Sequence, residues 1–211
     1  MPVNRRHAFA EGLTFPAPER LGSLPPEHPN HAFAERVWSN FRQAGTISDE
    51  ALLGADAWVI NLLGDRSRLT IGSCSIVRGI IRVERSGRVH IGDHCYVGDD
   101  VIISAHVGIY IEVDVLIAHG VQIFDNVSHP IDAMERAKHY RAILSGEPYI
   151  ATIPASPITI EKNAWIGLNS IIMRGVRIGA RSVVAAGSVV VDDVPAGTTV
   201  AGNPARPVRQ G

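Results

Sequence analysis

Nine histidines are the side chains of this 211-residue chain best suited to accept or donate a proton near neutral pH. His129 stands out among them because it lies in Ser128-His129-Pro130, where a long polar segment leaves a regular apolar pattern. An imidazole at such a junction can serve as a general base toward a hydroxyl or an amine. His119, inside the regular pattern, is either a substrate contact at the same site or a solvated side chain. His139, inside the polar segment, could close over a substrate, but we expect it to point to water.

Other kinds of chemistry find little support in the composition. Cys74 and Cys95 form no metal-binding or redox motif, so we expect no metal and no disulfide framework but small thiols in a reducing compartment. The 20 basic and 21 acidic residues leave a net charge of −1, which argues against binding to nucleic acid. The first residues contain no continuous apolar run, and no stretch approaches the roughly 20 apolar residues of a membrane span. We expect no membrane insertion and a cytoplasmic location.

A six-residue repeat supplies the framework that must position these groups. Every hexad that we identify opens with Ile or Val, and its fifth position is mostly small or β-branched. Short β-branched strands joined by tight turns cannot bury one face alone, so they stack into a solenoid. The openers are Ile71, Val77, Val83, Ile91, Val97, Ile103, Ile111, Ile117, Ile123, Ile160, Ile166, Ile172, Ile178, Val184 and Val190.

The spacing of the hexads predicts the shape of the solenoid. Ile71 to Ile91 and Ile91 to Ile111 are each 20 residues (three hexads plus two), whereas Ile160 to Ile178 is 18 (three hexads). A coil of three hexads makes a triangular prism, and about five coils follow from the length of the pattern. An ordinary β-sandwich is the alternative, but it predicts strands of variable length and no constant six-residue register.

The remaining segments divide the chain into two parts. Residues 1–68 form the first part, proline-rich and extended up to residue 30 and then helical over 31–62. Phe33, Val37 and Phe41 have helical spacing, and Ser48 is a candidate cap for a second helix over the segment that follows. Residues 69–211 form the solenoid, interrupted by a long loop over 124–157 that is partly helical; a loop of this length is usually functional.

Two stretches of this chain resemble a known family. IAHGVQIFDNVSHPID (residues 117–132) and AWIGLNSIIMRGVRIGARSVVAAGSVVVDDVPAGTTVAGNPARPVR (residues 164–209) are similar to the hexapeptide-repeat acyltransferases. The likeness covers about residues 69–209 and is greatest to maltose, galactoside and polysaccharide O-acetyltransferases. It implies a left-handed parallel β-helix, a homotrimer with clefts between neighbouring prisms, and acetyl-CoA as the acyl donor.

The same resemblance implies roles for individual residues on the acceptor side of the reaction. His129 matches the histidine of the family's His-Pro pair and would be the catalytic base of acyl transfer. Asp100 stands one coil earlier, in register with an Asn that commonly touches the acceptor in sugar acetyltransferases. A carboxylate there can still bind hydroxyls, and it could also attract an amino group. His119 is the second candidate for binding the acceptor.

On the donor side the resemblance implies two segments that bind coenzyme A. Ala186, Gly187 and Ser188 would let the pantetheine arm lie against the coils. Arg206 and Arg209, near the end of the chain, suit phosphate groups by charge and by donor geometry. No group in this set calls for a bound metal ion.

We therefore expect a coenzyme-A-dependent acyltransferase that uses direct general-base catalysis on a hydroxyl of a saccharide. N-acylation of an amino sugar or of a nucleotide-linked amino sugar is the main alternative. A γ-type carbonic anhydrase needs three histidine ligands with a close pair on one coil, whereas His119 and His129 are ten residues apart. A scaffold protein that has lost its chemistry is the remaining alternative, but it would not need both the His-Pro pair and the AGNPAR segment.

Overall fold

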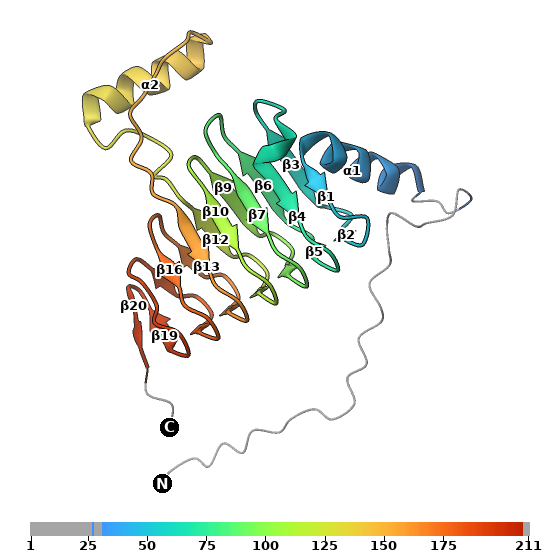
Figure 1. Ribbon diagram of the computed structural model, residues 1–211. Coiled ribbons are helices and arrows are strands. Elements are labelled where there is room, and N and C mark those ends of the chain that lie inside the picture. Colours follow the sequence, from blue (N-terminus) through green and yellow to red (C-terminus); the bar gives the residue numbers. More distant parts are fainter. Residues whose placement is uncertain (1–26, 28–30, 209–211) are drawn as a thin grey trace, which may run out of the picture.

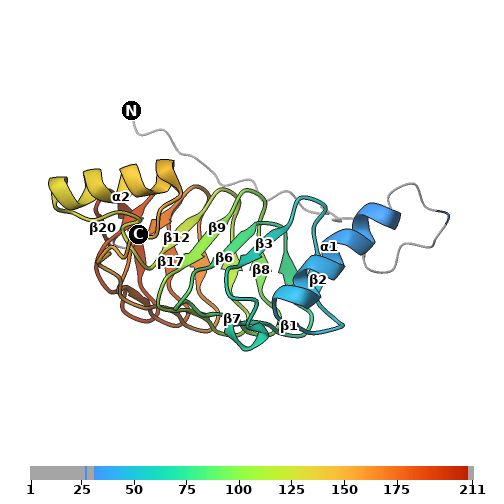
Figure 2. The same ribbon diagram turned by 90° about the horizontal axis from the view of Figure 1, so that it is seen from above.

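The computed structural model describes residue 27 and residues 31–208. Residues 31–208 form a triangular prism of three sheets, parallel except for the last strand of one of them, with one helix at the end of the prism and one projecting from it (Figures 1 and 2). Each coil contributes one strand to each sheet in turn. The parallel sheets and the hexapeptide repeats fit a left-handed β-helix. Neither helix of the described residues has the length and apolar character needed to span a bilayer.

Within residues 31–208, two of the three sheets have six strands and the third has eight. The first, here called sheet A, contains β1 (Thr46–Ile47), β4 (Leu69–Ile71), β7 (Val89–Ile91), β10 (Ile109–Ile111), β13 (Ile158–Ile160) and β16 (Arg177–Ile178). Sheet B contains β2 (Leu52–Leu53), β5 (Ile76–Val77), β8 (Tyr96–Val97), β11 (Leu116–Ile117), β14 (Trp165–Ile166), β17 (Val183–Val184), β19 (Thr199–Gly202) and β20 (Ala205–Pro207). Sheet C contains β3 (Trp58–Asn61), β6 (Ile80–Val83), β9 (Ile102–Ala105), β12 (Gln122–Phe124), β15 (Ile171–Ile172) and β18 (Val189–Val190).

The hexad openers form the core because their side chains point into the prism. In sheet A, Ile71 pairs with Ile91, which pairs with Ile111, so one inward column runs through successive coils. Ile91, Ile111 and Ile160 are all fully buried. Burial of such a side chain contributes about 1.5–3 kcal/mol, and a neighbouring coil is needed to complete it.

The solenoid begins one coil earlier than the sequence pattern indicated. Residues 48–62 do not form the expected second helix, and the coiled region starts at Thr46 and not at residue 69. Ile47 and Leu53 are six residues apart and pair in register with Ile71 and Val77. They therefore extend the six-residue repeat, here called the hexad lattice, back by one coil. Ser48 bonds to the Ser73 hydroxyl in a turn. The helical spacing there was overridden by pairing with the next coil, which makes six coils where about five were expected.

Helix α1 (His31–Ala44) covers the first coil. Its Val37 and Phe41 are buried, as the helical spacing predicted, whereas Phe33 is partly exposed. Trp38 adds a third large apolar side chain to this face. The helix packs against β1 and β3, at the end of the prism (Figure 1).

A long segment, residues 125–157, interrupts the coil between β12 and β13 and is here called the excursion. It carries α2 (Ala133–Ser145), which has no buried residue, and it leaves the prism at the corner where sheet C passes into sheet A (Figures 1 and 2). Asp132 caps the helix by accepting hydrogen bonds from two backbone N–H groups, and Gly146 ends it with φ +70°. After the excursion, β13 resumes the register of β10. The prism thus tolerates a long insertion at this corner.

The inward column predicts an asymmetry within a single strand, β13. Replacing the fully buried Ile160 with Ala should lower the free energy of unfolding by about 2–5 kcal/mol, because the site cannot collapse within a stacked column. Thr159→Ala, on the outer face of the same strand, should cost less than about 1 kcal/mol. Urea unfolding at equal protein concentration measures both. Equal losses would show that the column is not the main source of stability.

Candidate active site

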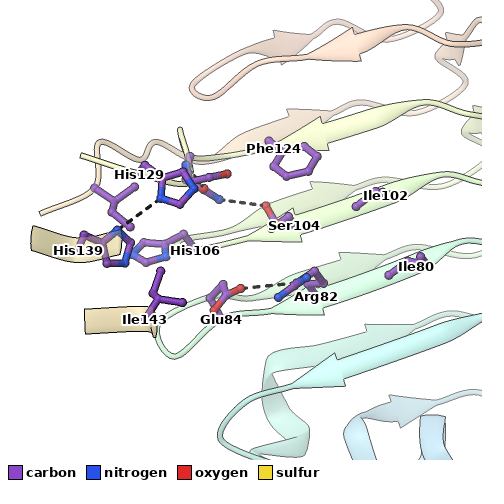
Figure 3. A pocket seen from close by; sticks show the side chains of 13 residues that line it. Ile80, Arg82, Glu84, Ile102, Ser104, His106, Phe124, His129, His139 and Ile143 are labelled. Carbon is purple, nitrogen blue, oxygen red and sulfur yellow. Dashed lines mark hydrogen bonds and ion pairs between the residues drawn. The ribbon is translucent and has the colours of Figure 1, made fainter. Parts of the chain in front are cut away.

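A cleft of about 500 Å³ lies between the outer face of sheet C and the base of the excursion (Figure 3). Its floor comes from three successive coils and its far wall from α2 and the returning chain. His129 stands at its edge, so the structure places the histidine singled out by the sequence in a cavity that can hold a ligand. The lining residues are Ile80, Arg82, Glu84, Ile102, Ser104, His106, Phe124, Asn126, Ser128, His129, His139, Ile143 and Ile153.

The floor of the cleft becomes more polar toward His129. Ile80 and Ile102 pair across neighbouring coils at the start of sheet C, and Arg82 pairs with Ser104 two residues further on. Ser104 in turn lies beside Phe124 of the next coil. The floor therefore has apolar side chains at one end, and a guanidinium, a hydroxyl and an aromatic ring next to one another at the other. Such a surface can bind the apolar face of a sugar ring together with its hydroxyl groups.

The backbone around His129 is held in a tight turn. Ser128 has φ +62°, and its N–H donates to the Asn126 side-chain oxygen at 2.8 Å. The N–H of His129 donates to the Val127 carbonyl at 2.7 Å. A polar side chain that bonds to the backbone two residues on replaces the regular strand pairing. The chain therefore leaves the lattice at this point, which directs His129 away from the core.

A buried carboxylate anchors this turn to the previous coil. Asp125 is fully buried, and its two oxygens accept the backbone N–H groups of His106, Val107 and Gly108 at 2.7 Å each. The Asn126 amide donates to the same carboxylate at 3.0 Å. Hydrogen bonds to a charged acceptor offset the cost of burying it. Sequence reasoning missed Asp125 and Asn126; an acidic residue directly after an apolar strand was the available signal.

The excursion brings a second imidazole to the site. His139 of α2 places its Nδ1 3.5 Å from Nδ1 of His129 (Figure 3). On its other side, His139 stacks on Tyr149, with ring centroids 5.8 Å apart. The Tyr149 hydroxyl donates to Glu135, which also accepts from Lys138 at 2.8 Å. The expectation that His139 points to water was wrong, because the excursion folds back and places this side chain in the cleft.

The hydrogen bonds among Lys138, Glu135 and Tyr149 shift the pKa values of the carboxyl and the phenol in opposite directions. The hydrogen bond from Lys138, followed by the one from Tyr149, lowers the pKa of the Glu135 carboxyl. The hydrogen bond to Glu135 raises the pKa of the Tyr149 phenol. Near neutral pH, Glu135 is therefore a carboxylate and Tyr149 retains the proton that it donates.

Asp100 and His119 lie at a different corner of the prism. They occupy the turns from sheet B into sheet C, at the opposite end of the sheet C strands from His129, and they do not line the cleft. Asp100 is exposed with φ +57°. His119 Nδ1 accepts the backbone N–H of Asp99 at 2.9 Å, and Asp99 pairs with Arg78 at 2.6 Å. Within one chain, these two candidate acceptor contacts are thus separated from the candidate base.

The segments expected to bind coenzyme also lie along the sheet B to sheet C corner or close to the chain end. Ala186 and Gly187 are exposed in one such turn, with φ +70° at Gly187, while Ser188 is buried and donates to the Ala185 carbonyl. Arg206, in β20, forms an ion pair with Asp192 at 3.0 Å. Arg209 falls outside the described residues.

Neither cysteine lines the cleft. Cys74 is exposed in a turn between β4 and β5, and Cys95 is buried, which raises the pKa of its thiol. A buried thiol with a raised pKa is a poor nucleophile. Between residues 31 and 208, no cluster of three or more His, Cys, Asp or Glu side chains has the arrangement of a metal site.

Known proteins share both the repeat and the fold of this chain. The hexapeptide repeat of succinyl-transferase matches residues 88–124 and 157–191. The Saccharomyces cerevisiae protein YJL218W, provisionally named an acetyltransferase, is 36% identical over 146 residues, which cover 68% of each chain. The 2,3,4,5-tetrahydropyridine-2,6-dicarboxylate N-acetyltransferase of Staphylococcus aureus is 49% identical over 69 residues, but these cover 33% of this chain and 28% of that enzyme.

Two solved structures extend the comparison to most of the solenoid. The polySia-specific acetyltransferase NeuO is 27% identical with a TM-score of 0.63, covering 78% of this chain and 70% of NeuO. The hexapeptide-repeat acetyltransferase VCA0836 of Vibrio cholerae, solved in complex with acetyl coenzyme A, is 27% identical with a TM-score of 0.56. That match covers 87% of this chain and 79% of VCA0836.

The three backbone hydrogen bonds to the buried Asp125 carboxylate, here called the Asp125 clamp, lead to one prediction about stability and activity together. Asp125→Asn should lower the free energy of unfolding by about 2–4 kcal/mol, because an amide group would face three buried N–H donors. It should also lower turnover by loosening the His129 turn. Asp114→Asn is the matched control, since Asp114 is exposed and bonds to the Asn163 side chain. Thermal unfolding and steady-state assays test this; wild-type behaviour of Asp125→Asn would show that the clamp is dispensable.

Proposed function

We propose that this chain, which belongs to the hexapeptide-repeat acyltransferase family, transfers an acetyl group from acetyl-CoA to a hydroxyl of a saccharide. An acyl-CoA-dependent acyltransferase is what the comparisons show; the saccharide and the acetyl group are our inference. The observation that carries the proposal is His129 at the edge of a cleft with an apolar and polar floor. A screen of acetyl-CoA turnover against sugars, amino sugars and nucleotide sugars tests the choice of acceptor.

His129 would act as the general base in a direct transfer. Its Nε2 takes the proton of the acceptor hydroxyl while the hydroxyl oxygen attacks the thioester carbonyl, and the proton then passes to the departing sulfur. The new C–O bond replaces the C–S bond, so no further reactant is needed. A covalent acyl-enzyme is disfavoured because the cleft contains no cysteine and Cys95 is buried with a raised thiol pKa.

The floor of the cleft supports a saccharide acceptor. Glu84 and Arg82, which pair at 3.8 Å, supply an acceptor and donors for hydroxyls, and Phe124 offers an aromatic face to the apolar side of a sugar ring. NeuO, an acetyltransferase specific for polySia, has a similar fold, and we take its acceptor as support for a saccharide here. Asp100 and His119 stay proposed acceptor contacts, without support from the cleft of a single chain.

Acetyl-CoA as donor is supported by VCA0836, which was solved with that molecule bound. We propose that the turn of Ala186, Gly187 and Ser188 accommodates the pantetheine arm, and that Arg206 and Arg209 bind phosphate. Arg206 pairs with the exposed carboxylate of Asp192, which it would exchange for phosphate when the coenzyme binds. The cytoplasmic location stays a prediction.

Transfer to an amino group is the second candidate. The similarity of one third of this chain to a Staphylococcus aureus N-acetyltransferase favours it, and the Glu84 carboxylate in the cleft suits an ammonium group. A matched pair of acceptors, a sugar and its 2-amino analogue, separates the two reactions: preference for the amine would replace O-acetylation as the proposal.

A homotrimer is the assembly that we propose, and the outer faces of the sheets support it. Sheet A presents a largely polar column of Thr70, His90, Tyr110, Thr159 and Arg177. Sheet B presents an apolar one of Leu52, Ile76, Tyr96, Leu116, Trp165 and Val183. Sheet C is also mainly apolar, with Trp58, Ile80, Ile102, Ile171 and Val189. Two apolar faces and one polar face suit a closed ring in which each copy meets two neighbours.

The proposed mechanism predicts a specific loss at His129. His129→Ala should lower kcat by about 10²–10⁴-fold, the usual contribution of a general base, while the KM for acetyl-CoA stays within a few-fold. His119→Ala removes an imidazole at another corner and should cost distinctly less. Steady-state kinetics with both substrates varied measures these effects. Retained activity in His129→Ala, or ping-pong kinetics, would contradict the mechanism.

The assembly predicts a mass of three chains of 22.7 kDa each in solution. Trp165→Asp, on the apolar face of sheet B, should shift the protein toward monomers because it places a charge in the proposed interface. Tyr110→Asp, on the polar face of sheet A, should leave the trimer intact. Light scattering at micromolar concentration decides; a wild-type mass of one chain would refute the trimer.

A further inference from the structure

The imidazole of His139 is the only described side chain within hydrogen-bonding distance of the His129 ring. The two Nδ1 atoms are 3.5 Å apart, at the long limit of a hydrogen bond, and the rings are tilted by 56°. Catalytic hydrogen bonds are often long in free enzymes and shorten when substrate binds. Because Nδ1 of His129 faces His139, Nε2 is the nitrogen available to an acceptor.

His139 is itself held from two sides. Its position on α2 places it one turn after Glu135, and its ring stacks on Tyr149 beyond the end of the helix. Glu135 accepts the Tyr149 hydroxyl and Lys138 Nζ, so the aromatic ring is tied back to the same helix. A ring fixed in this way can act as a rigid partner, whereas a freely rotating exposed histidine could not.

We propose that His139 is the positioning residue of His129, a role that rests on the proposed function. Either ring could donate across an Nδ1–Nδ1 contact, but a base that acts through Nε2 needs its own proton on Nδ1; in the proposed arrangement His129 Nδ1–H therefore donates to His139 Nδ1, and His139 carries its proton on Nε2. This arrangement fixes the tautomer in which His129 Nε2 is free to take a proton. When Nε2 takes the acceptor proton, His129 becomes an imidazolium, and its Nδ1–H bond to His139 becomes charge-assisted. His139 stabilises the intermediate without touching the substrate.

Two substitutions at His139 separate a positioning role from simple packing. His139→Phe keeps a ring for Tyr149 to stack on but removes the acceptor nitrogen, so kcat should fall about 10- to 100-fold, part of what general-base catalysis supplies. His139→Asn places an amide oxygen near the position of Nδ1 and should recover much of that loss. The KM for acetyl-CoA should stay unchanged in both. Arg141→Ala, on an exposed position of α2, is the control for effects of altering the helix.

Tyr149→Phe tests the support of His139 by a second route. It preserves the stacking and removes the hydroxyl bond to Glu135, so kcat should fall by a smaller factor, about 3- to 10-fold. If His139→Asn loses as much activity as His139→Phe while Arg141→Ala does not, a hydrogen-bond acceptor at this position is not what His129 requires, and the proposal is overturned. Wild-type kcat in His139→Phe overturns it as well.

A double-mutant cycle distinguishes failure of this inference from failure of the proposed function. If His139 acts through His129, then His139→Phe should cost nothing further in a His129→Ala background. A full additional loss there would show that His139 acts independently. If His129→Ala alone is fully active, the proposed base is wrong, whatever His139 does. If His129→Ala is inactive and His139→Phe is normal, only the positioning role is refuted.

Discussion

Each coil of this protein is stable only because another coil covers it. A hexad contributes two to four strand residues, too few to bury a face, and its Ile or Val side chain becomes part of a core only within a column through the prism. This constraint fixes the spacing of the strands, the alternation of inward and outward residues and the position of every turn. The six-residue register also assigns each residue to a sheet and a coil. Residues far apart in sequence that share a position in the register therefore lie on the same surface of the prism.

The candidate site arises where the chain departs from that register. Asp125 follows β12 and points inward as the first residue of a hexad would. Its carboxylate accepts hydrogen bonds from three backbone N–H groups of the preceding coil. It thereby connects the excursion to the prism without a strand. The excursion can then contribute His129 from its first turn and His139 from its helix, both over a floor supplied by sheet C. Rigid coils position one side of the cleft and a helix without buried residues positions the other.

The sequence predicts the lattice well because the lattice is local: six-residue spacing is visible without knowing any contact. The same rule applies before residue 69, since Ile47 and Leu53 are six residues apart, but it was not extended there, and a helix was wrongly expected after Ser48. His129 could be found through its place at the end of the pattern. Asp125 is visible as an acidic residue directly after an apolar strand, but its role is not, since that role depends on backbone groups 17 to 19 residues away. The closeness of His139 to His129 likewise depends on how the excursion folds back.

Helix α1 has a consequence beyond the burial of its own apolar face. A solenoid ends in a coil whose strands have unpaired backbone groups on one side, and such an edge is a template for another chain. At one end α1 packs against β1 and β3, and at the other β20 pairs antiparallel with β19, opposite to the direction in which a further coil would add. Each element covers part of the edge at which another prism could add, so both oppose end-to-end joining into fibres.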